Sequence, residues 1–446
     1  MRVLIYGLGR SGLAVARLCH GQGHRLGFYD RREEGDDITA LLALGAERFD
    51  DVPAADFDVC IAAPGVAIDH ADLQALRGKG VETIGEVEWV HRTIGADMIG
   101  VTGTAGKGTV TRWLADTLTL SGLDARAGGN IDPALAEVAE EGATLVVEMS
   151  SFQLERCPTL RPRVAVILNL GSDHLDRHGD LATYHSAKRN LLANLGPAEL
   201  FVYNADDALL ADWAGNVHSR TAGFSLKQPA SAWLRSDGML VMGDDELLSV
   251  SELQVRGKHH QANALAVALA AREMGSSTEQ IRAGLRAFAG LPGRYSEAGR
   301  IGRVTFIEDS IATRVLSVAA ALEATPAPVV WIAGGQSKGA DVRELEPLIR
   351  DKVRLFVAVG ESGPELRETV GEWVPTHLCS QRDGVAALRC AVRAALHHLN
   401  VHSPLGGTVL LAPLAASFDQ FRDYRQRAEA FRAVVRAEEV AWTLSS

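Results

Sequence analysis

Residues 98–113, MIGVTGTAGKGTVTRW, constrain this chain more than any other stretch. A short apolar run leads into a glycine-rich turn, and a segment with helical patterning follows. This order is typical of a phosphate-binding loop, because the N–H groups of the turn, the helix N-terminus and Lys107 all attract anions. The Ser or Thr that usually follows the lysine is replaced by Gly108, and Thr109 comes one residue later. The stretch therefore indicates a nucleotide site, with an ordinary glycine-rich turn as the alternative.

A nucleoside triphosphate has the anionic shape that such a turn holds, and Lys107 adds a full positive charge to the backbone dipoles. We therefore expect a nucleoside triphosphate as the ligand of this loop. The residues predicted to contact it are Gly103, Thr104, Gly106, Lys107, Gly108 and Thr109.

The size and charge of the chain limit the classes of protein to which it can belong. Its 446 residues exceed one typical domain, so two or three domains are expected. The formal net charge of -11 argues against a nucleic-acid-binding protein, which usually carries a basic face. No apolar run approaches the ~18 residues of a membrane span, and the first residues lack the features of a signal peptide. These observations predict a cytoplasmic protein that contacts neither membrane nor nucleic acid.

The cysteines give a prediction about redox state. The chain has five, Cys19, Cys60, Cys157, Cys379 and Cys390, and they are widely spread without any CxxC pair. An odd number with this spacing is typical of reduced thiols in a cytoplasmic protein. We therefore expect neither a disulfide nor a zinc site.

A second glycine-rich turn lies at the start of the chain. Residues 2–6 form a strand pattern, the run Gly7-Leu8-Gly9-Arg10-Ser11-Gly12 follows, and a second strand pattern ends at Asp30. In dinucleotide-binding folds, such glycines admit a pyrophosphate and the acid binds a ribose hydroxyl. The motif alone is a weak signal, but here a strand precedes it and a helix follows. It predicts a diphosphate ligand, with UDP-linked and ADP-linked compounds as alternatives to NAD.

Alternating strand and helix patterns predict an α/β fold of three domains. A Rossmann-like domain is expected over residues 1–93, and a P-loop ATPase-like domain over 94–290. The run Gly290-Leu291-Pro292-Gly293 indicates the next boundary. A third, Rossmann-like domain occupies 291–446, with strands expected at 304–308, 329–333, 355–359 and 408–412 and a last helix at about 419–440.

Polar side chains follow the expected strands of the central domain. Glu148 ends an apolar strand after the phosphate loop, where metal-binding acids lie in P-loop enzymes. The pair Asp173-His174 follows another strand and can hold a divalent ion or orient a phosphate. A solvated strand-end glutamate and a structural histidine are the alternatives. Lys188 by itself is typical of a surface lysine.

The third domain carries its own polar loops after its expected strands. They contain Asp309-Ser310, Thr313, Lys338, Asp341 and Ser417. Ligands of α/β sheets bind outside the carboxyl ends of the strands, although the run GGQSKG around Lys338 fits a plain turn equally well. Two candidate anion sites in separate domains are typical of an enzyme that joins two substrates with ATP, with domain closure bringing the substrates together.

With these motifs together, the chain resembles the Mur ligase family over nearly its whole length. The resemblance is carried by GLGRSG, APGVAI, GVTGTAGKGT, GGNID, VVEMSSFQLE, NLGSDHLDRHGDLATYHSAK, GLPGR, EDSIATR, GGQSKGAD and LLAPLAASFDQFRDYRQRAEAF. SSFQLE, the spacing DHLDRH…Y…AK, GGQSKGAD and SFDQF are specific in combination. Folylpolyglutamate synthases share the loop and the DH region but lack the UDP-type N-terminal domain.

The resemblance implies an ATP-dependent ligase of peptidoglycan synthesis that adds D-glutamate to UDP-N-acetylmuramoyl-L-alanine. The substrate carboxylate would attack the γ-phosphate of ATP, and the glutamate amine would then displace phosphate from the acyl phosphate. Because both steps concentrate negative charge, Mg²⁺ and lysines are the expected stabilisers. The implied partners are these small molecules, and we expect a monomer.

The resemblance also implies a role for each matching residue. The UDP-sugar substrate is expected at Gly9, Arg10, Ser11, Asp30, Arg31, Asn130 and Ser150. The ATP site gains Asn263, Arg294 and Asp309. Glutamate is expected at Thr313, Ser417 and Tyr424. Two Mg²⁺ ions are expected at Glu148, His174, Thr109 and Lys188, the last carrying CO₂ as a carbamate. The implied catalytic set is Lys107, Lys188, His174 and Lys338, which lies near the incoming amino acid.

Some positions depart from the family pattern. Ala105 and Gly108 replace the usual asparagine and hydroxyl residue of the loop, which removes an expected protein ligand of Mg²⁺. Ile311 replaces a lysine expected to pair with a glutamate carboxylate, and an isoleucine cannot form that pair. Arg314 is the candidate replacement. The change bears on whether D- or L-glutamate is used.

Three other functions fit parts of the sequence. The same scaffold could join L-glutamate or another acidic amino acid. The changes in the phosphate loop favour a catalytically silent UDP-sugar binder descended from a ligase. The run GLGRSG alone suits an NAD-dependent oxidoreductase, but that function leaves the phosphate loop and Glu148 unexplained.

Overall fold

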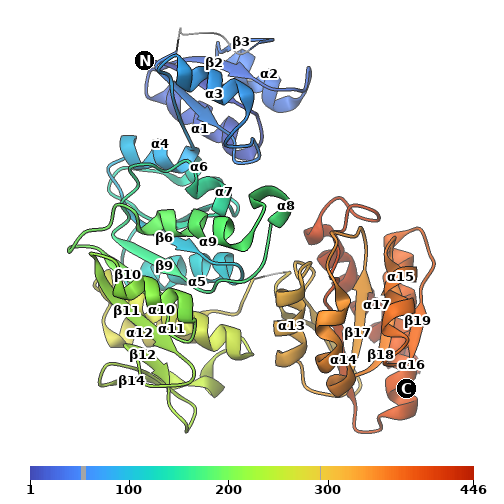
Figure 1. The fold of residues 1–446 in the computed structure, drawn as a ribbon. Helices are drawn as coiled ribbons and strands as arrows, with labels where there is room; N and C mark the ends of the chain where they lie inside the picture. The colour runs from blue at the N-terminus through green and yellow to red at the C-terminus, as the bar shows by residue number, and fades with distance from the viewer. Residues whose placement is uncertain (52–56, 292, 446) are drawn as a thin grey trace. The chain divides into compact units, whose positions relative to one another are not determined.

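The computed structural model describes residues 1–51, 57–291 and 293–445, so Pro292 of the predicted domain break lies outside them. Strands and helices alternate through the described part of the chain, and the strands form three sheets (Figure 1). The predicted α/β fold is confirmed. The chain divides into two compact units, Met1–Leu253 with Gln261–Phe288, and Gln254–His260 with Ala289–Ser446. The first two sheets belong to the first unit and the third sheet to the second.

The first sheet is parallel, in the order β3-β2-β1-β4-β5. Its strands are β1 Arg2–Tyr6, β2 Arg25–Tyr29, β3 Glu47–Arg48, β4 Val59–Ala62 and β5 Glu82–Ile84. Its helices are α1 Arg10–Gly21, α2 Asp36–Ala43, α3 Ala71–Gly78 and α4 Glu86–Thr93. The central strands β1 and β4 are almost entirely buried, as expected where helices cover both faces of a parallel sheet.

The second sheet has the order β14-β13-β12-β11-β10-β9-β6-β8-β7. Its strands are β6 Asp97–Thr102, β7 Ala125–Gly129, β8 Thr144–Glu148, β9 Val164–Ile167, β10 Leu200–Asn204, β11 Arg220–Ser225, β12 Ala232–Leu234, β13 Met239–Met242 and β14 Asp245–Ser249. The strands from β7 to β12 are parallel, while β13 and β14 are antiparallel additions. Asp237-Gly238, a residue pair typical of β-hairpins, lies in the turn between the antiparallel strands β12 and β13.

The helices of the second sheet's region include α5, which follows β6 directly. Their bounds are α5 Lys107–Leu120, α6 Leu135–Val138, α7 Ser151–Leu154, α8 Leu175–His178, α9 Leu181–Arg189, η1 Asn190–Leu192, α10 Ala208–Gly215, η2 Val250–Glu252, α11 Lys258–Glu273 and α12 Thr278–Ala287. Because β6, β8 and β9 run parallel, their carboxyl ends meet at one edge, and the loops after them carry the predicted nucleotide and metal residues.

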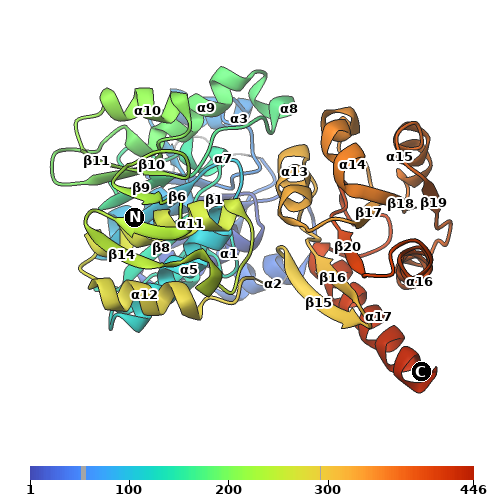
Figure 2. The ribbon, with the colours of Figure 1, turned by 90° about the horizontal axis from the view of Figure 1, so that it is seen from below.

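The third sheet has the order β15-β16-β20-β17-β18-β19. Its strands are β15 Ser296–Ile301, β16 Val304–Glu308, β17 Val329–Gly334, β18 Val353–Val359, β19 Thr376–Leu378 and β20 Gly407–Leu411. Its helices are α13 Val315–Ala324, η3 Val342–Leu345, α14 Glu346–Lys352, α15 Gly363–Val370, α16 Gly384–His402 and α17 Tyr424–Ser445. The four predicted strands are found, with β15 and β19 added at the edges. Helices α16 and α17 lie side by side beside this sheet (Figure 2).

The predicted start of the last helix is wrong. Helix α17 begins at Tyr424, not near residue 419. The Ser417 carbonyl accepts hydrogen bonds from the N–H groups of Gln420 (3.1 Å) and Phe421 (2.7 Å), so the chain makes a tight turn first. The alternation of apolar and charged residues in this turn resembles that of a helix. No residue pattern indicates the hydrogen bonds to Ser417, so the sequence could not distinguish the turn from a helix.

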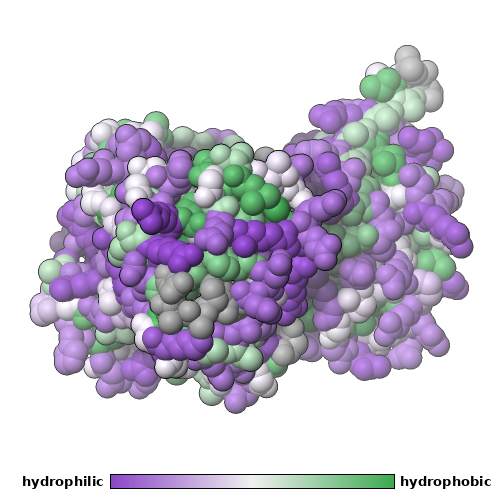
Figure 3. Space-filling view, turned by 90° about the horizontal axis from the view of Figure 1, so that it is seen from above, coloured by the Kyte–Doolittle hydropathy of each residue, from purple (hydrophilic) through white to green (hydrophobic). Residues whose placement is uncertain are grey.

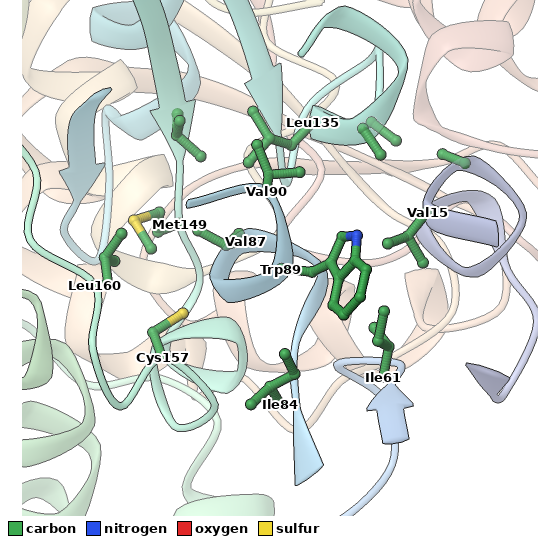
Figure 4. Packing of buried hydrophobic residues seen from close by; sticks show 14 of the residues in the cluster. Val15, Ile61, Ile84, Val87, Trp89, Val90, Leu135, Met149, Cys157 and Leu160 are labelled. Atoms are coloured by element: carbon green, nitrogen blue, oxygen red, sulfur yellow. The ribbon is translucent and has the colours of Figure 1, made fainter. Parts of the chain in front are cut away.

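One hydrophobic core joins the first two sheets. Trp89 and Val87 of α4 are buried among Val15 of α1, Ile61 of β4 and Leu135 of α6 (Figure 4). Burying an aromatic side chain of this size stabilises the packing by about 2–3 kcal/mol. The α4 segment therefore acts as a packed joint between the first sheet and the second.

The prediction that all five cysteines are reduced is wrong for two of them. Cys379 and Cys390 form a disulfide, whereas Cys19, Cys60 and Cys157 are free and buried. Cys379 directly follows β19 and Cys390 lies in α16, so the fold of the second unit brings together thiols that the sequence spacing did not pair.

Helix length and apolar character bear on membrane contact. None of the helices in the described part of the chain combines the length and the apolar character that a bilayer crossing requires. On the face drawn in Figure 3, hydrophilic side chains dominate and apolar residues form small patches among them.

Candidate active site

The predicted phosphate loop has the geometry expected of it. Strand β6 ends at Thr102, the turn follows, and α5 begins at Lys107. Gly106 caps the helix with φ +84°, a left-handed conformation that favours glycine. A Cβ at this position would lie 3.0 Å from Asn263 Oδ1, so the turn also passes close to α11. The loop therefore depends on glycine at this position, and Asn263, which stays a prediction as a nucleotide contact, lies beside it.

Two lysines converge on this loop. Lys107 Nζ donates to the carbonyl oxygens of Gly103 (2.9 Å) and Thr104 (3.1 Å). Lys188 Nζ donates to the same Gly103 oxygen at 2.9 Å and lies 4.7 Å from the centre of the Tyr184 ring. Lys188 is only 1% exposed. The interpretation of Lys188 as a surface lysine, which its isolated sequence context favoured, is therefore wrong.

Asn169 fixes the loop from the next strand along the sheet. Its Oδ1 accepts a hydrogen bond from the Ala105 N–H (2.8 Å), and its Nδ2 donates to the Ala105 carbonyl (3.1 Å). Thr104 Oγ1 accepts from the Gly171 N–H at 2.8 Å. Asn169 was not among the predicted site residues. Its position directly beyond β9, at the carboxyl edge of the sheet, was the available signal.

Glu148 ends β8, the strand beside β6, and is 3% exposed. Its Oε1 accepts a hydrogen bond from Asn130 Nδ2 at 2.9 Å, while its Oε2 is buried without a hydrogen-bond partner among the described residues. Asp132, two residues after Asn130, forms an ion pair with Arg10 of α1. Glu148, the predicted metal ligand, is thus hydrogen-bonded to Asn130, a predicted substrate residue. The same segment, 130–132, is joined through Asp132 to Arg10, a predicted substrate residue of the first sheet.

His174 reaches the loop region through aromatic contacts. Its backbone has φ 51°, its ring packs on Phe152 (4.8 Å between centres), and its Nε2 lies 3.4 Å from an Asp173 carboxylate oxygen. Phe152 also stacks on His178, whose ring packs against Tyr184, the residue beneath Lys188. His174 and Lys188 therefore belong to one packed cluster. Phe152 and His178 were not predicted as site residues.

The N-terminal glycine-rich turn closes around Asp30. The Asp30 carboxylate accepts hydrogen bonds from the Leu8 N–H (2.5 Å) and from the Arg32 N–H and Nε (2.9 and 3.0 Å). Burial raises the pKa of Asp30, but these hydrogen bonds outweigh it and leave the pKa below its usual value. At Gly12, a Cβ would lie 2.6 Å from the Gly7 carbonyl, so helix α1 approaches the turn as closely as glycine permits.

An open cavity of about 480 Å³ lies beside this turn. It is lined by Tyr29, Asp30, Arg31, Glu33, Arg48 and Asp50. Arg31 is exposed there, whereas Arg32 binds the Leu8 carbonyl and Asp37. The predicted residues Asp30 and Arg31 thus meet at one cavity. Gly9 caps α1 and Ser11 lies in its first turn.

Other predicted substrate residues are used in local structure. Ser150 caps α7: its Oγ accepts from the Gln153 N–H (3.3 Å), and its own N–H donates to Gln153 Oε1 (2.9 Å). Nearby, Arg156 Nη2 and Arg177 Nη2 donate to the Val66 carbonyl at 2.5 and 3.0 Å. These arginines, which were not predicted, tie the APGVAI turn of the first sheet to the loops of the second.

The second unit holds the remaining predicted residues. Arg294, Asp309, Thr313, Lys338, Ser417 and Tyr424 all lie in it, whereas the phosphate loop lies in the first unit. Lys338 is exposed in the loop after β17, and Ser417 is buried beyond β20. Burial, reinforced by the charge of Glu308, raises the pKa of Asp309 to about 7.

Arg427 organises the loops of this unit and was missed by sequence analysis. It is 3% exposed, and its guanidinium donates to Ser310 Oγ (2.9 Å), to the Ser310 carbonyl (2.8 Å) and to the Ala415 carbonyl (3.1 Å). Burial lowers its pKa to about 10. A buried arginine with these partners holds the loops after β16 and β20 together, and both carry predicted glutamate residues.

Comparisons with known proteins identify the family. A model described as "Mur ligase MurD-like, N-terminal domain" matches residues 1–85, and the "Mur ligase middle domain" matches 101–271. The UDP-N-acetylmuramoylalanine--D-glutamate ligase of Thermus thermophilus is 42% identical over 444 residues, covering 99% of both chains. The protein of the same name from Deinococcus radiodurans is 42% identical, covering 98% of this chain and 92% of its own.

Solved structures agree on the fold. A pseudomurein peptide ligase type C from Methanothermus fervidus matches with a TM-score of 0.62 at 16% identity, covering 98% of this chain and 99% of its own. UDP-N-acetylmuramate-alanine ligase from Thermotoga maritima matches with a TM-score of 0.59 at 19% identity, covering 98% and 100%. The 42% identity to the D-glutamate ligases extends over nearly the whole chain. Together with the two matching domain models, it shows that this chain belongs to the Mur ligase family.

Proposed function

We propose that this chain is an ATP-dependent ligase that joins D-glutamate to UDP-N-acetylmuramoyl-L-alanine through an acyl phosphate. The relatives that bear this name align with almost the whole chain. The structural observation that carries the proposal is the meeting of Lys107 and Lys188 on the Gly103 carbonyl, at the edge where β8 ends in Glu148. Two amines and a buried carboxylate at a glycine-rich turn suit phosphoryl transfer.

The domain roles follow the same proposal. Residues 1–93 would bind the UDP group at the cavity of Asp30 and Arg31, residues 94–290 would bind ATP, and residues 291–446 would bind glutamate. The reaction would serve peptidoglycan synthesis in the cytoplasm. The support is that each of the three sheets lies within one of these segments.

Lys107 would bind the β- and γ-phosphates. Its ammonium already faces the interior of the turn, where it donates to the Gly103 and Thr104 carbonyls. A triphosphate would replace these neutral acceptors with charged ones, which make stronger hydrogen bonds. Asn169 would keep the turn open for the phosphates, because it holds both backbone groups of Ala105.

The donor set suits Mg²⁺. Glu148 offers a buried carboxylate oxygen without a hydrogen-bond partner among the described residues, and Thr109 is buried in the first turn of α5. With His174 and a carbamate on Lys188, these residues would hold two ions. Bound Mg²⁺ would neutralise charge on the transferring phosphate. Asn130 would orient Glu148 through its 2.9 Å hydrogen bond.

A carbamate is compatible with the position of Lys188. Adding CO₂ to Nζ leaves one N–H, which can keep the hydrogen bond to the Gly103 carbonyl. The new carboxylate would add oxygen ligands of the kind that Mg²⁺ prefers. The nearly complete burial of the side chain shields such a group from bulk water.

Glutamate would bind in the second unit, at Thr313, Ser417 and Tyr424, with Lys338 near its amine. Arg427 supports these positions, because it ties the Ser310 loop to the chain before Ser417. Ile311 is half-buried in the same loop, and Arg314 caps α13 three residues later. Arg314 would supply the cation that Ile311 lacks. Because Ile311 replaces the lysine usual in the family, L-glutamate stays the second candidate substrate.

Phosphate release separates these substrates. Purified chain with ATP, Mg²⁺ and UDP-N-acetylmuramoyl-L-alanine is mixed with D-glutamate, L-glutamate, D-aspartate or no amino acid. We expect product and phosphate with D-glutamate alone. Release with L-glutamate alone would overturn the stereochemical assignment, and substrate binding without turnover would favour a silent UDP-sugar binder.

A further inference from the structure

His377, Cys379 and Cys390 form a cluster at the β19 end of the third sheet, apart from every residue assigned above. His377 lies in β19, and Cys379 is the first residue after that strand. The Cys379 N–H donates to the Ala358 carbonyl of β18 (2.9 Å), so the pairing with β18 continues past the end of β19. Side chains two residues apart in a strand point to the same face. His377 and Cys379 therefore share one face of the edge strand.

Cys390 completes the cluster from α16, which packs on β18 at the same end of the sheet (Figure 2). Its Sγ lies 3.7 Å from His377 Nε2, and one ligand atom of each of the three residues lies within 4.8 Å of the others. Cys379 is buried, Cys390 is half-buried and His377 is exposed. The cluster thus has a protein side and a solvent side.

This ligand set has a definite chemical preference. Two thiolates and an imidazole nitrogen are ligands that Zn²⁺ takes in tetrahedral sites, and three protein ligands leave a fourth position for water. The disulfide seen in the structure is the oxidised form of the same pair. A dithiol reductant that transfers two electrons to the S–S bond yields two thiols, and metal binding then releases their two protons.

We propose that reduced Cys379 and Cys390, together with His377, bind one Zn²⁺ ion, and that the disulfide and the metal are alternative states of this site. In either state the edge strand β19 is fastened to α16. A small-molecule disulfide returns the pair to the oxidised state: the Cys390 thiolate attacks it and releases one thiolate, and the Cys379 thiolate then attacks Cys390 Sγ and releases the second. Because both thiolate ligands are consumed, Zn²⁺ is released to solvent. The site is independent of the proposed ligase activity.

Cobalt titration tests the proposal. The full chain is reduced with a phosphine, freed of metal and titrated with Co²⁺, whose sulfur-to-metal absorption reports thiolate ligands. We expect this absorption to saturate at one equivalent and to be displaced by Zn²⁺, and the oxidised chain to show none. Cys379→Ser and Cys390→Ser should each weaken Co²⁺ binding by more than about 100-fold, since loss of outer-shell partners alone costs about 10–100-fold.

Two control variants separate this site from other ligands. Cys19→Ala removes a buried thiol of the first unit. His398→Ala removes part of the nearby pair His398 and His402 on α16, whose rings lie 4.7 Å apart and would bind metal through nitrogen only. Both variants should keep the sulfur-to-cobalt absorption unchanged.

Thermal unfolding gives a second readout that needs no catalysis. Zn²⁺ should raise the unfolding temperature of the reduced chain by mass action, but not that of the Cys379→Ser/Cys390→Ser double variant. The proposal is overturned if a chain shown by thiol titration to be fully reduced gives no sulfur-to-cobalt absorption. It is equally overturned if the absorption persists in the folded double variant.

Discussion

The two glycine-rich turns of the first unit share the order strand, turn and helix, but a different side chain is hydrogen-bonded to the backbone of each turn. Both follow a parallel strand and precede a helix. The N-terminal turn closes on a carboxylate, because Asp30 accepts the Leu8 N–H. The phosphate loop closes on an amide, because Asn169 binds both backbone groups of Ala105, and two lysines point at its Gly103 carbonyl.

This difference decides which ligand each turn suits. A turn occupied by a carboxylate already contains negative charge, so it is suited to ribose hydroxyls and a modest diphosphate charge. A turn occupied by a neutral amide and faced by two lysines is suited to a triphosphate. Under the proposed function, the same backbone motif would therefore serve substrate binding in one place and phosphoryl transfer in the other.

Replacing Lys107 should have the largest effect. Lys107→Ala removes the amine that faces the Gly103 and Thr104 carbonyls, and we expect kcat to fall by at least about 1,000-fold, since removal of one electrostatic donor alone costs about 100–1,000-fold. Binding of the UDP-sugar, measured by calorimetry, should not change. Lys227→Ala, at an exposed lysine of the same unit, is the control. Retained turnover would show that the turn does not bind the reacting phosphate.

Lys188→Ala should lower kcat by about 100-fold, because it removes the second donor and its carbamate. A short carboxylic acid added to the assay should restore part of the activity, since it can replace the missing carboxylate. The same acid should have no effect on Lys107→Ala. A fully active Lys188→Ala variant would remove this residue from the proposed site.

Asn169→Ala sharpens the comparison, because it removes the amide that distinguishes the phosphate loop. Both hydrogen bonds to Ala105 are lost, and we expect KM for ATP to rise about 10-fold, equivalent to about 1.4 kcal/mol. KM for the UDP-sugar should stay constant. Asn216→Ala, at the end of α10, is the matched control. A rise in both KM values would mean that Asn169 supports the whole unit and not the loop.

Asp30→Asn should have the smallest effect and the opposite selectivity. KM for the UDP-sugar should rise about 3–5-fold and KM for ATP should not change, since about 1 kcal/mol is typical of one hydrogen bond.

Asp30 should also make the stability of the fold depend on pH, because its pKa is lowered in the folded chain. Its carboxylate stabilises the fold above its unfolded pKa of about 3.9, and this stability is lost as the pH falls through the lower folded value. Urea unfolding should show less acid-side loss in Asp30→Asn than in Asp36→Asn.

The sequence predicted those features that depend on local pattern. Glycine spacing located both turns, and apolar runs located β6, β8 and β9 within a residue or two. Parallel strands then placed Glu148 beside the loop without further information. The resemblance to a known family, and not the spacing, singled out Lys188 from other lysines.

What the sequence could not predict depends on contacts between distant segments. In the sequence, Arg427 is one of several charged residues of a helix and is expected at the surface. Only the folded chain shows that it is buried against Ser310 and Ala415. Cys379 and Cys390 meet because an edge strand lies beside α16. Asn169 follows an apolar run that the sequence did locate, but its contact with the loop depends on β9 lying beside β6. Long-range packing sets each of these contacts, so no local pattern encodes them.

Oxygen transfer tests the central claim most directly. UDP-N-acetylmuramoyl-L-alanine labelled with oxygen-18 in its alanine carboxylate is turned over with ATP and D-glutamate, and the released phosphate is analysed by mass spectrometry. If the carboxylate is activated as an acyl phosphate at the Lys107 turn, each released phosphate carries one labelled oxygen. Product formation with unlabelled phosphate would contradict the account.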